Sequence, residues 1–499
     1  MIDPELSRDM LAKGIDMDLS LSMLDNINAG LYDGGSTVDV AGVPPVDGTS
    51  IVPAGIGMRY TVDHVAASAR LVLLGLAMPA GAVVHGSTVT LDRPALVDLG
   101  ERLYAHTAWG VLNGGSATSY ADTKKNRSLG AGVFEAVEPW FNMLAPLCQG
   151  RPKGVTPAYI NPDGSPGASF ITLKMRAALL RAARYVDRFG KPDRPVLPFF
   201  QMTSDATDRL LAAAYADYAK DDWLAPLIAA TGTDPTRPRS AKQPLVSAFT
   251  HSSDGHPRRI FEHAYGKPHS TVALPGGHGQ GFRVLAPIYR ELLDAGYRYA
   301  YLGNVDNAGY FPDPAELAVM ALSGAPAAFE FSYRTAVDIK GGVLVQTVNG
   351  GRTVVDIGQA ISFERVKAIE AAGQRVLFNC ATGLFDLAWL VPHLDDIAGR
   401  LPVRVSDQDK DAGRYSQAEQ STWEVVGLIP DLLGFAVEKG ERFIAAKLLV
   451  ETLLASSIVD PVNVDETIAS TAHMMSEGLR AVLSGPCGLR LERGMWRPV

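Results

Sequence analysis

Short apolar runs alternate with longer amphipathic stretches along the chain from about residue 106 onward. The apolar runs predict strands at 109–112, 195–202, 245–250 and 298–302. The longer stretches at 170–188 and 284–295 have helical periodicity, and Gly296 suits the left-handed position that ends the second helix. In the helix at 170–188, apolar positions 170, 173, 177 and 180 share one face, and the charged positions 174, 181, 184 and 188 share another.

This alternation predicts an α/β fold of Rossmann-like type, with a mixed, mostly parallel sheet covered by helices on both faces. We expect residues 106–400 to form this domain. Residues 1–105 look mainly helical, with a helix near 91–104. Residues 401–499 form a smaller C-terminal α/β-to-helical region, in which we predict a strand at 402–405 and helices at 416–437 and 441–457.

Charge and cysteine content narrow the class of protein. The chain has 499 residues, a formal net charge of −8 and no long run of Lys or Arg, so a nucleic-acid interface is not expected. Its three cysteines form no Cys-x-x-Cys pair, which argues against a disulfide framework or a structural zinc and suits the reducing cytoplasm.

No membrane segment or signal peptide is expected. The N-terminus lacks a basic stretch followed by an apolar run. The apolar stretch 65–84 contains Arg70 and is broken by Pro79 and Gly81. It therefore predicts a buried helix and a turn rather than a membrane span.

Three polar or glycine-containing segments follow predicted strands, at 113–115, 202–204 and 304–306. In open α/β sheets, ligands bind beyond the carboxyl ends of the strands. We therefore expect these segments to lie in one binding site.

Two glycine-rich turns are suited to close contact with a ligand. Gly114 and Gly115 follow a strand, so their N–H groups can point at a bound group. The turn around Gly277 and His278 can hydrogen-bond a base edge or a ribose. Each segment is also compatible with a plain turn or a flexible loop.

Charged and amide side chains supply further candidates. Lys153 follows a proline that favours an extended residue before it, and a lysine so placed can meet a phosphate. Asn304 and Asp306 alternate with Val305, so both can face the same way, and a carboxylate there is a natural Mg²⁺ ligand. The alternatives are a solvated loop lysine and a capping aspartate.

The order of these segments resembles the eukaryotic-type UDP-glucose pyrophosphorylase (UTP–glucose-1-phosphate uridylyltransferase) family. The matching blocks are Leu-Asn-Gly-Gly at 112–115, Met-Thr-Ser at 202–204, Phe-Thr-His-Ser at 249–252, Pro-Gly-Gly-His-Gly at 275–279, Asn-Val-Asp-Asn at 304–307, Lys-Gly-Gly at 340–342, Phe-Asn at 378–379 and Arg-Phe-Ile-Ala-Ala-Lys at 442–447. Each block is short, and their joint order carries the resemblance.

The resemblance implies a GT-A-like nucleotidyltransferase that uses Mg²⁺ and joins UTP to a sugar 1-phosphate, with glucose 1-phosphate the expected sugar. Lys153 and Lys447 would be the catalytic lysines, and Asp306 would bind the metal. The nucleotide would be bound by Leu112, Asn113, Gly114, Gly115, Met202, His251, Gly277 and His278. The sugar would be bound by Asn304, Gly341, Asp356 and Asn379.

The chain also departs from the family pattern. Ala117 and Ala121 replace family glycines, and Lys125 stays a second candidate for the phosphate-binding lysine. His251 stands where the family has a uracil-contacting Gln. No hexapeptide repeat follows Lys447, so the C-terminal left-handed β-helix of the glucose enzymes is not expected.

Several alternatives stay open at this point. The sugar can be an N-acetylhexosamine or galactose. The protein can bind a UDP-sugar without turnover, or it can be a glycosyltransferase on a similar sheet, although the Asp-x-Asp motif of such enzymes is not evident near Asp306. The oligomeric state is not indicated by the sequence.

Overall fold

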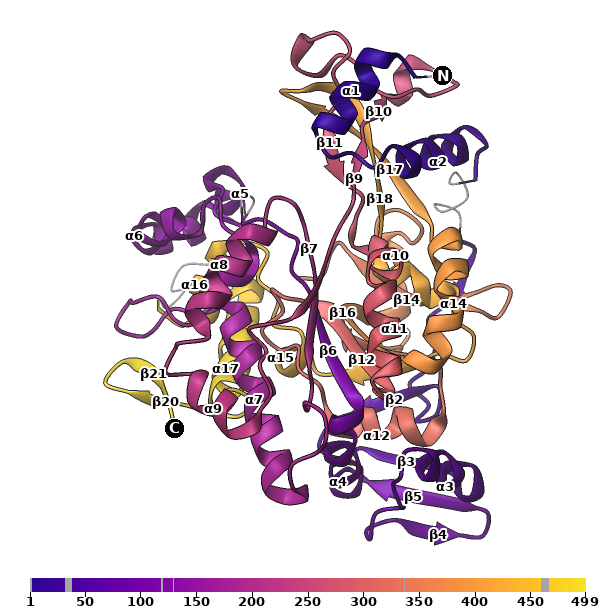
Figure 1. Ribbon diagram of the computed structural model, residues 1–499, viewed down its shortest axis with the longest axis vertical. Helices are drawn as coiled ribbons and strands as arrows, with labels where there is room; N and C mark the ends of the chain where they lie inside the picture. Colours follow the sequence, from indigo (N-terminus) through magenta and orange to yellow (C-terminus); the bar gives the residue numbers. More distant parts are fainter. Residues whose placement is uncertain (1, 32–37, 118–119, 129, 336, 459–465) are drawn as a thin grey trace.

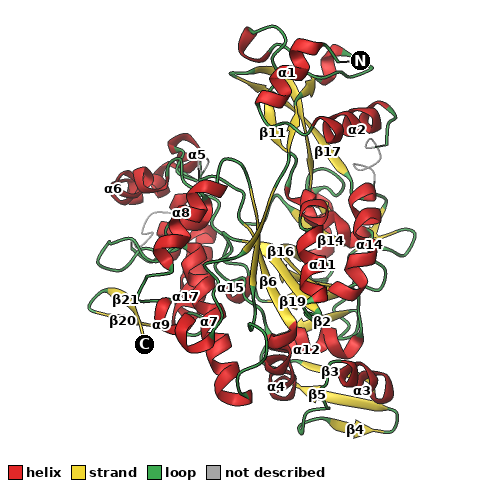
Figure 2. Cartoon of the chain, viewed as in Figure 1, coloured by secondary structure: helices red, strands yellow, loops and turns green. Residues whose placement is uncertain are grey.

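The computed structural model describes residues 2–31, 38–117, 120–128, 130–335, 337–458 and 466–499. Its centre is an 11-stranded sheet with helices on both faces (Figures 1 and 2). The main path runs in the order β2 (Ile51–Ala54), β19 (Leu433–Val437), β13 (Ala327–Tyr333), β16 (Leu377–Asp386), β12 (Tyr299–Asn304), β6 (Thr107–Leu112), β7 (Phe199–Thr203) and β8 (Arg239–Lys242). A side branch adds β1 (Val40–Gly42), β14 (Gly342–Thr347) and β15 (Arg352–Asp356).

On the main path, β16 pairs antiparallel with both of its neighbours and the other neighbouring strands pair in parallel. The predicted mixed, mostly parallel α/β sheet is therefore confirmed. Buried strands of this kind divide their side chains between two cores, because successive residues point to opposite faces. In β6, Trp109 and Val111 enter one core, and Ala108 and Leu112 enter the other.

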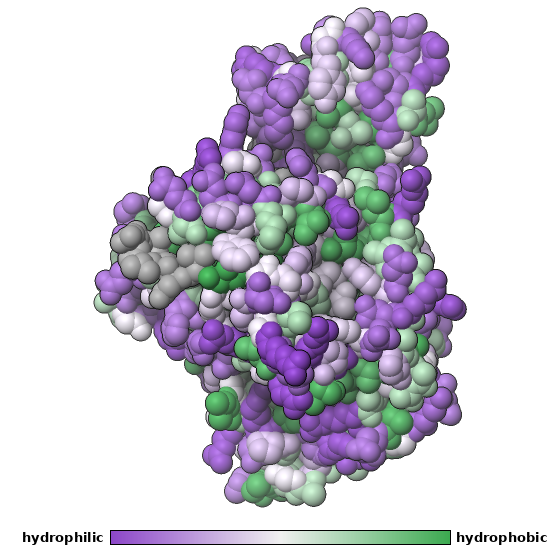
Figure 3. Space-filling model, turned by 90° about the vertical axis from the view of Figure 1, so that its left-hand side faces the viewer, coloured by the Kyte–Doolittle hydropathy of each residue, from purple (hydrophilic) through white to green (hydrophobic). Residues whose placement is uncertain are grey.

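Each core is covered by its own set of helices. The core that contains Trp109 packs against α4 (Arg93–Leu103), α7 (Phe170–Phe189), α12 (Pro314–Ser323), α16 (Leu449–Ala455) and α17 (Glu466–Ser484). The opposite core packs against α10 (Gly281–Val284), α11 (Ala286–Asp294) and α14 (Leu387–Arg400). The remaining helices of the main body are α5 (Thr123–Arg127), α6 (Ala131–Cys148), α8 (Asp208–Tyr218), α9 (Ala225–Thr231), α13 (Phe363–Ala371) and α15 (Lys439–Arg442). Polar and apolar residues are interspersed on the face shown in Figure 3.

An arm stands above the carboxyl ends of the central strands (Figure 1). It is built from β9 (Leu245–Ser247), β10 (Phe249–Thr250), β11 (Ala273–Pro275), β17 (Val403–Lys410) and β18 (Gly413–Gln420), with α1 (Pro4–Ala12) and α2 (Met17–Asn28) packed against it. A small lobe at the other end contains β3 (Arg59–Asp63), β4 (Val83–His85), β5 (Thr88–Asp92) and α3 (His64–Leu73). At the C-terminus, β20 (Leu489–Glu492) and β21 (Met495–Pro498) form a hairpin.

Several sequence-based predictions need correction. The stretch 1–105 contains helices but also β1–β5, and β1 and β2 join the central sheet through pairing with distant strands. The predicted helix at 416–437 is instead β18, a 3₁₀ helix (Thr422–Gly427) and β19, because pairing with β17 and β13 overrides the helical propensity of this segment. The division into three domains stays a prediction.

The stretch 65–84 is helical at its start, as predicted, but it is not a buried helix. In α3, Val65 is 74% exposed and Leu73 is 83% exposed, whereas Ala67 and Leu71 pack inward. Among the helices of the described residues, none combines the length and the apolar character that crossing a bilayer needs.

Candidate active site

The three segments predicted to share one sheet edge do so. Leu112 at the end of β6 lies in register with Met202 of β7 and with Asn304 of β12. The Asn113 N–H donates to the Met202 carbonyl at 2.8 Å, and the Val305 N–H donates to the Leu112 carbonyl at 3.2 Å. The carboxyl ends of these neighbouring strands therefore form one surface.

The glycine loop after β6 approaches its neighbours closely. A Cβ on Gly114 would lie 3.1 Å from the Thr203 carbonyl oxygen, whereas a Cβ on Gly115 would meet nothing within 4 Å. The Ser204 hydroxyl donates to the Gly114 carbonyl at 2.7 Å. Gly114 is thus needed for packing, while the space at Gly115 is open to a ligand.

Asn113 does not present its side chain to this open space. It is fully buried, and its Nδ2 donates to Gln201 Oε1 at 3.2 Å and to the Tyr215 hydroxyl at 3.0 Å. Gly154 packs so closely on this amide that a Cβ there would lie 2.3 Å from Asn113 Oδ1. The side chain of Asn113 therefore anchors the glycine loop to the protein interior.

Lys153 lies beside the glycine loop, and its N–H donates to the Gly115 carbonyl at 2.9 Å. Its Nζ is buried, has no hydrogen-bond partner among the described residues, and stands 2.8 Å from the centre of the Tyr120 ring. Burial lowers the pKa of Lys153 to about 7, while the nearby Asp306 carboxylate opposes this shift. Because Nζ is buried, side chains around it would have to move before a phosphate could reach this amine. Lys125, the second candidate, lies exposed on α5.

Asp306 and Lys447 meet at the centre of the surface. Lys447 Nζ lies 3.0 Å from Asp306 Oδ2, and the lysine side chain is 61% exposed while that of the aspartate is 14% exposed. The segments that carry them are joined by a bridge between Asn307 and Ala445 and by an Ala446 N–H bond to the Asp306 carbonyl. The described chain therefore holds a basic and an acidic group together beside Lys153.

The residues present fit a Mg²⁺ ion that is held mainly by phosphate. Asp306 Oδ1 is buried and accepts no hydrogen bond from the described residues. No group of three or more His, Cys, Asp or Glu side chains suited to a metal is found in the part of the chain that the structure describes. One carboxylate completed by substrate phosphates and water is the usual arrangement for Mg²⁺.

Three of the four predicted sugar-binding residues, Gly341, Asp356 and Asn379, also come together. Gly342 pairs with Asp356 across β14 and β15, and a Cβ on Gly342 would lie 3.6 Å from the Asn379 Cβ and 3.7 Å from Asp356 Oδ1. Gly341 has a φ of +114°, and a Cβ there would lie 2.6 Å from the Phe378 ring. Asp356 is paired with Arg404 of the arm, a residue that the sequence reasoning did not single out.

The turn that contains Gly277 and His278 packs against the end of β18. A Cβ on Gly277, whose φ is +90°, would lie 2.3 Å from the Gln420 carbonyl oxygen. His278 Nδ1 accepts the Thr422 N–H at 2.9 Å, and burial lowers the pKa of this imidazole to about 4, to which the Lys447 charge contributes. His278 is therefore neutral at pH 7.

His251 is not brought to this surface. It lies in the arm after β10, where its Nε2 is 3.7 Å from Asp407 Oδ2 and its Nδ1 is 2.9 Å from the Ser253 hydroxyl. Gln243, directly after β8, lies beside the glycine loop instead, because a Cβ on Gly114 would be 3.3 Å from its Oε1. In the sequence, Gln243 directly follows the short strand 239–242 and precedes Pro244, and this position at a strand end was the signal that could have identified it.

The helical pattern placed Lys174 on one face of α7 with other charged residues and indicated no role for it. It is 1% exposed, and its Nζ donates to the main-chain carbonyls of Asn307 and Tyr310. The sequence contained no signal for these contacts, because their partners lie more than a hundred residues away.

Together, the strand edge, the open glycine loop and the lysines give this α/β protein a surface of the type that suits a nucleotide and its phosphates. Residues 258–479 match the model of the family described as UTP–glucose-1-phosphate uridylyltransferase. The resemblance seen in the sequence is thereby confirmed: this part of the chain is similar to that family.

Known relatives agree with this assignment. The UTP–glucose-1-phosphate uridylyltransferase of Encephalitozoon cuniculi is 24% identical over 185 residues, which cover 37% of this chain and 37% of the relative. The UDP-glucose pyrophosphorylase of Leishmania major superposes with a TM-score of 0.56 at 16% identity over 91% of this chain and 79% of that one. A Trypanosoma brucei UDP-glucose phosphorylase has a TM-score of 0.55 at 18% identity, over 91% and 77% of the two chains. These structural likenesses establish a shared fold.

Proposed function

We propose that this protein transfers a uridylyl group from UTP to glucose 1-phosphate, forming UDP-glucose and pyrophosphate. The observation that carries the proposal is the pairing of Lys447 with Asp306, at 3.0 Å, beside the buried amine of Lys153, which has no hydrogen-bond partner among the described residues. A basic and an acidic group at the end of parallel strands suit a reaction between two phosphates. A variant of the L. major relative has been solved with UDP-glucose, which agrees with this substrate class.

The reaction is a direct displacement. An oxygen of the sugar phosphate attacks the α-phosphorus of UTP, a new P–O bond forms, and the bond from the α-phosphorus to the bridging oxygen breaks as pyrophosphate leaves. Lys447, whose amine is accessible, would bind the sugar phosphate and the α-phosphate. Lys153 would bind the UTP phosphates once the side chains around it move aside. Both lysines would lower the charge repulsion between the two anions and hold them in line.

Asp306 would hold Mg²⁺ through its free Oδ1. When bound, the ion would neutralise charge on the UTP phosphates. Lys447 now shares the other oxygen of this carboxylate, so the lysine also fixes the orientation of Asp306.

The nucleotide would lie over the open loop at Gly115. We propose that Gln243, rather than His251, contacts the base, because its amide lies against Gly114 while His251 is engaged in the arm. Leu112, Met202 and the turn around Gly277 would form the rest of the surface. Asn304, Asp356 and Asn379 would bind the sugar hydroxyls.

The reverse reaction tests the proposal against the alternatives. UTP should appear when the protein is mixed with UDP-glucose, pyrophosphate and Mg²⁺, and Lys267→Ala, which changes an exposed arm lysine, should be as active as the wild type. A glycosyltransferase would consume UDP-glucose without pyrophosphate, and a silent binder would make no UTP. We also propose a cytoplasmic location, since Cys148, Cys380 and Cys487 are free thiols.

A further inference from the structure

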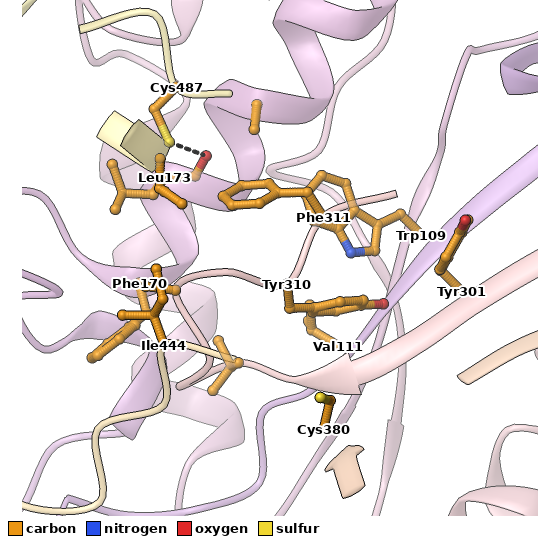
Figure 4. Close-up of a cluster of buried hydrophobic side chains, with 14 of the residues drawn as sticks. Trp109, Val111, Phe170, Leu173, Tyr301, Tyr310, Phe311, Cys380, Ile444 and Cys487 are labelled. Carbon is orange, nitrogen blue, oxygen red and sulfur yellow. Dashed lines mark hydrogen bonds between the residues drawn. The ribbon is translucent and has the colours of Figure 1, made fainter. Parts of the chain in front are cut away.

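Lys174 is a buried amine that the proposed chemistry does not use. It lies on the first turns of α7, is 1% exposed, and forms no ion pair within the described residues. The Lys174 amine lies beside the rings of Tyr310 and Phe311, whose centroids are 4.9 and 5.3 Å from Nζ (Figure 4 shows both rings). A buried lysine without a carboxylate partner is costly to the folded state, so stability alone does not account for it.

The amine is bonded to the segment that follows β12. Lys174 Nζ donates to the Asn307 carbonyl at 2.7 Å and to the Tyr310 carbonyl at 3.1 Å. Two N–H donors meet two carbonyl acceptors, and a lysine has at least two such donors whether or not it is protonated. These contacts bind both ends of the segment to α7.

The side chain of Asn307 in turn binds the main chain of the segment 442–444. Its Oδ1 accepts the Ile444 N–H at 2.9 Å, and its Nδ2 donates to the Arg442 carbonyl at 2.9 Å. Asp306 precedes Asn307 in the chain, and Lys447 follows Ile444 by three residues. A shift of Asn307 would therefore displace Asp306 and Lys447 relative to each other.

We propose that Lys174 is a positioning residue for uridylyl transfer, which anchors the Asn307–Tyr310 segment so that Asp306 and Lys447 keep their relative placement. The proposal rests on the proposed function. It predicts that loss of the Lys174 donors lowers turnover more than ligand binding, because reacting groups lose alignment while the glycine loop stays in place.

Arg176 provides a matched control on the same helix. It is also buried, and it donates to the main-chain carbonyls of Cys487, Trp223 and Gly488 at 2.8, 2.8 and 3.3 Å. These carbonyls belong to the turn that precedes the C-terminal hairpin and to the segment before α9, and none belongs to the Asp306 segment. Arg176→Met therefore removes a buried cation from α7 without removing a support of the site.

The test compares Lys174→Met, Lys174→Gln and Arg176→Met with the wild type in kcat, in KM for UTP, in UDP-glucose binding by calorimetry and in thermal unfolding. We expect Lys174→Met to lower kcat about a hundredfold, with KM and UDP-glucose affinity within about threefold of wild type. Lys174→Gln keeps a hydrogen-bond donor on a shorter side chain and carries no charge. Its kcat should lie between those of the wild type and Lys174→Met. Arg176→Met should lose stability but keep kcat.

Equal losses of kcat in Lys174→Met and Arg176→Met, or a normal kcat in either folded Lys174 variant, would show that Lys174 only supports the fold. If Lys174→Met does not fold, Lys174→Gln decides the question by the same measurements. Absence of turnover in the wild-type protein would refute the proposed function instead, so the two failures are distinguishable.

Discussion

Lys447 Nζ lies 3.0 Å from the Asp306 carboxylate although the two residues are 141 positions apart in the chain. The chain between them forms β13, β14, β15, β16 and β19 of the central sheet. It also forms β17 and β18 of the arm. Two charged residues brought together over such a distance, at the end of β12, are typical of a site rather than of a surface ion pair, which contributes little to stability.

Removal of the Lys447 amine tests the role of this pair. Lys447→Ala should lose several orders of magnitude in turnover, because the charge that aligns the two phosphates is gone, while UTP still binds. Pyrophosphate release and calorimetric titration with UTP measure the two effects. Lys267→Ala is the matched control, and near-normal turnover in Lys447→Ala would rule out the assignment.

The open space at Gly115 allows a steric test of nucleotide binding. A Cβ there meets no protein atom within 4 Å, so Gly115→Ala should change the free energy of unfolding by no more than about 0.5 kcal/mol. We expect KM for UTP to rise about tenfold or more, because the added methyl group occupies space that the nucleotide needs. An unchanged KM would mean that the nucleotide does not lie over this loop.

The residue that contacts the base can be decided by two substitutions. Gln243→Ala should raise KM for UTP and weaken discrimination against other nucleoside triphosphates, since the amide beside Gly114 is removed. His251→Ala should leave both nearly unchanged, because His251 is held in the arm by Ser253 and Asp407. Steady-state kinetics with UTP, CTP and ATP compare the two variants. If His251→Ala raises KM for UTP and Gln243→Ala does not, His251 contacts the base.

These positions also show what the sequence could reveal. The strands that end at Leu112 and Asn304 were predictable from short apolar runs followed by Gly or Asn, and so was their common edge. His251 was assigned through motif order, but the arm formed by β9 and β10 carries it away from the sheet edge. The buried position of Lys174 depends on carbonyl groups far along the chain, and no local pattern indicates such a partner.

Acid should destabilise the fold through two partly buried, neutral histidines. Burial lowers the pKa of His278 and of His106 to about 4, so the unfolded chain, with a histidine pKa near 6.5, binds protons more readily. Their contribution to stability is therefore present above pH 6.5 and is lost as the pH falls toward 4. For the partly buried His278, this amounts to about 2 kcal/mol between pH 7 and pH 5.

Urea unfolding at pH 7 and pH 5 measures this effect. His278→Asn is the control, because an amide oxygen can accept the same Thr422 N–H without titrating. The variant should lose less stability than the wild type over this range. Equal losses in the two proteins would show that His278 does not titrate as its surroundings indicate.

Pyrophosphate release from UTP and glucose 1-phosphate, with Mg²⁺ present, tests the central claim most directly. Galactose 1-phosphate and N-acetylglucosamine 1-phosphate are assayed beside it, together with a reaction in which EDTA removes the metal. We predict release that requires both glucose 1-phosphate and Mg²⁺. No release with any sugar phosphate, from protein that still binds UDP-glucose, would contradict the account and identify a protein that binds UDP-sugar without turnover.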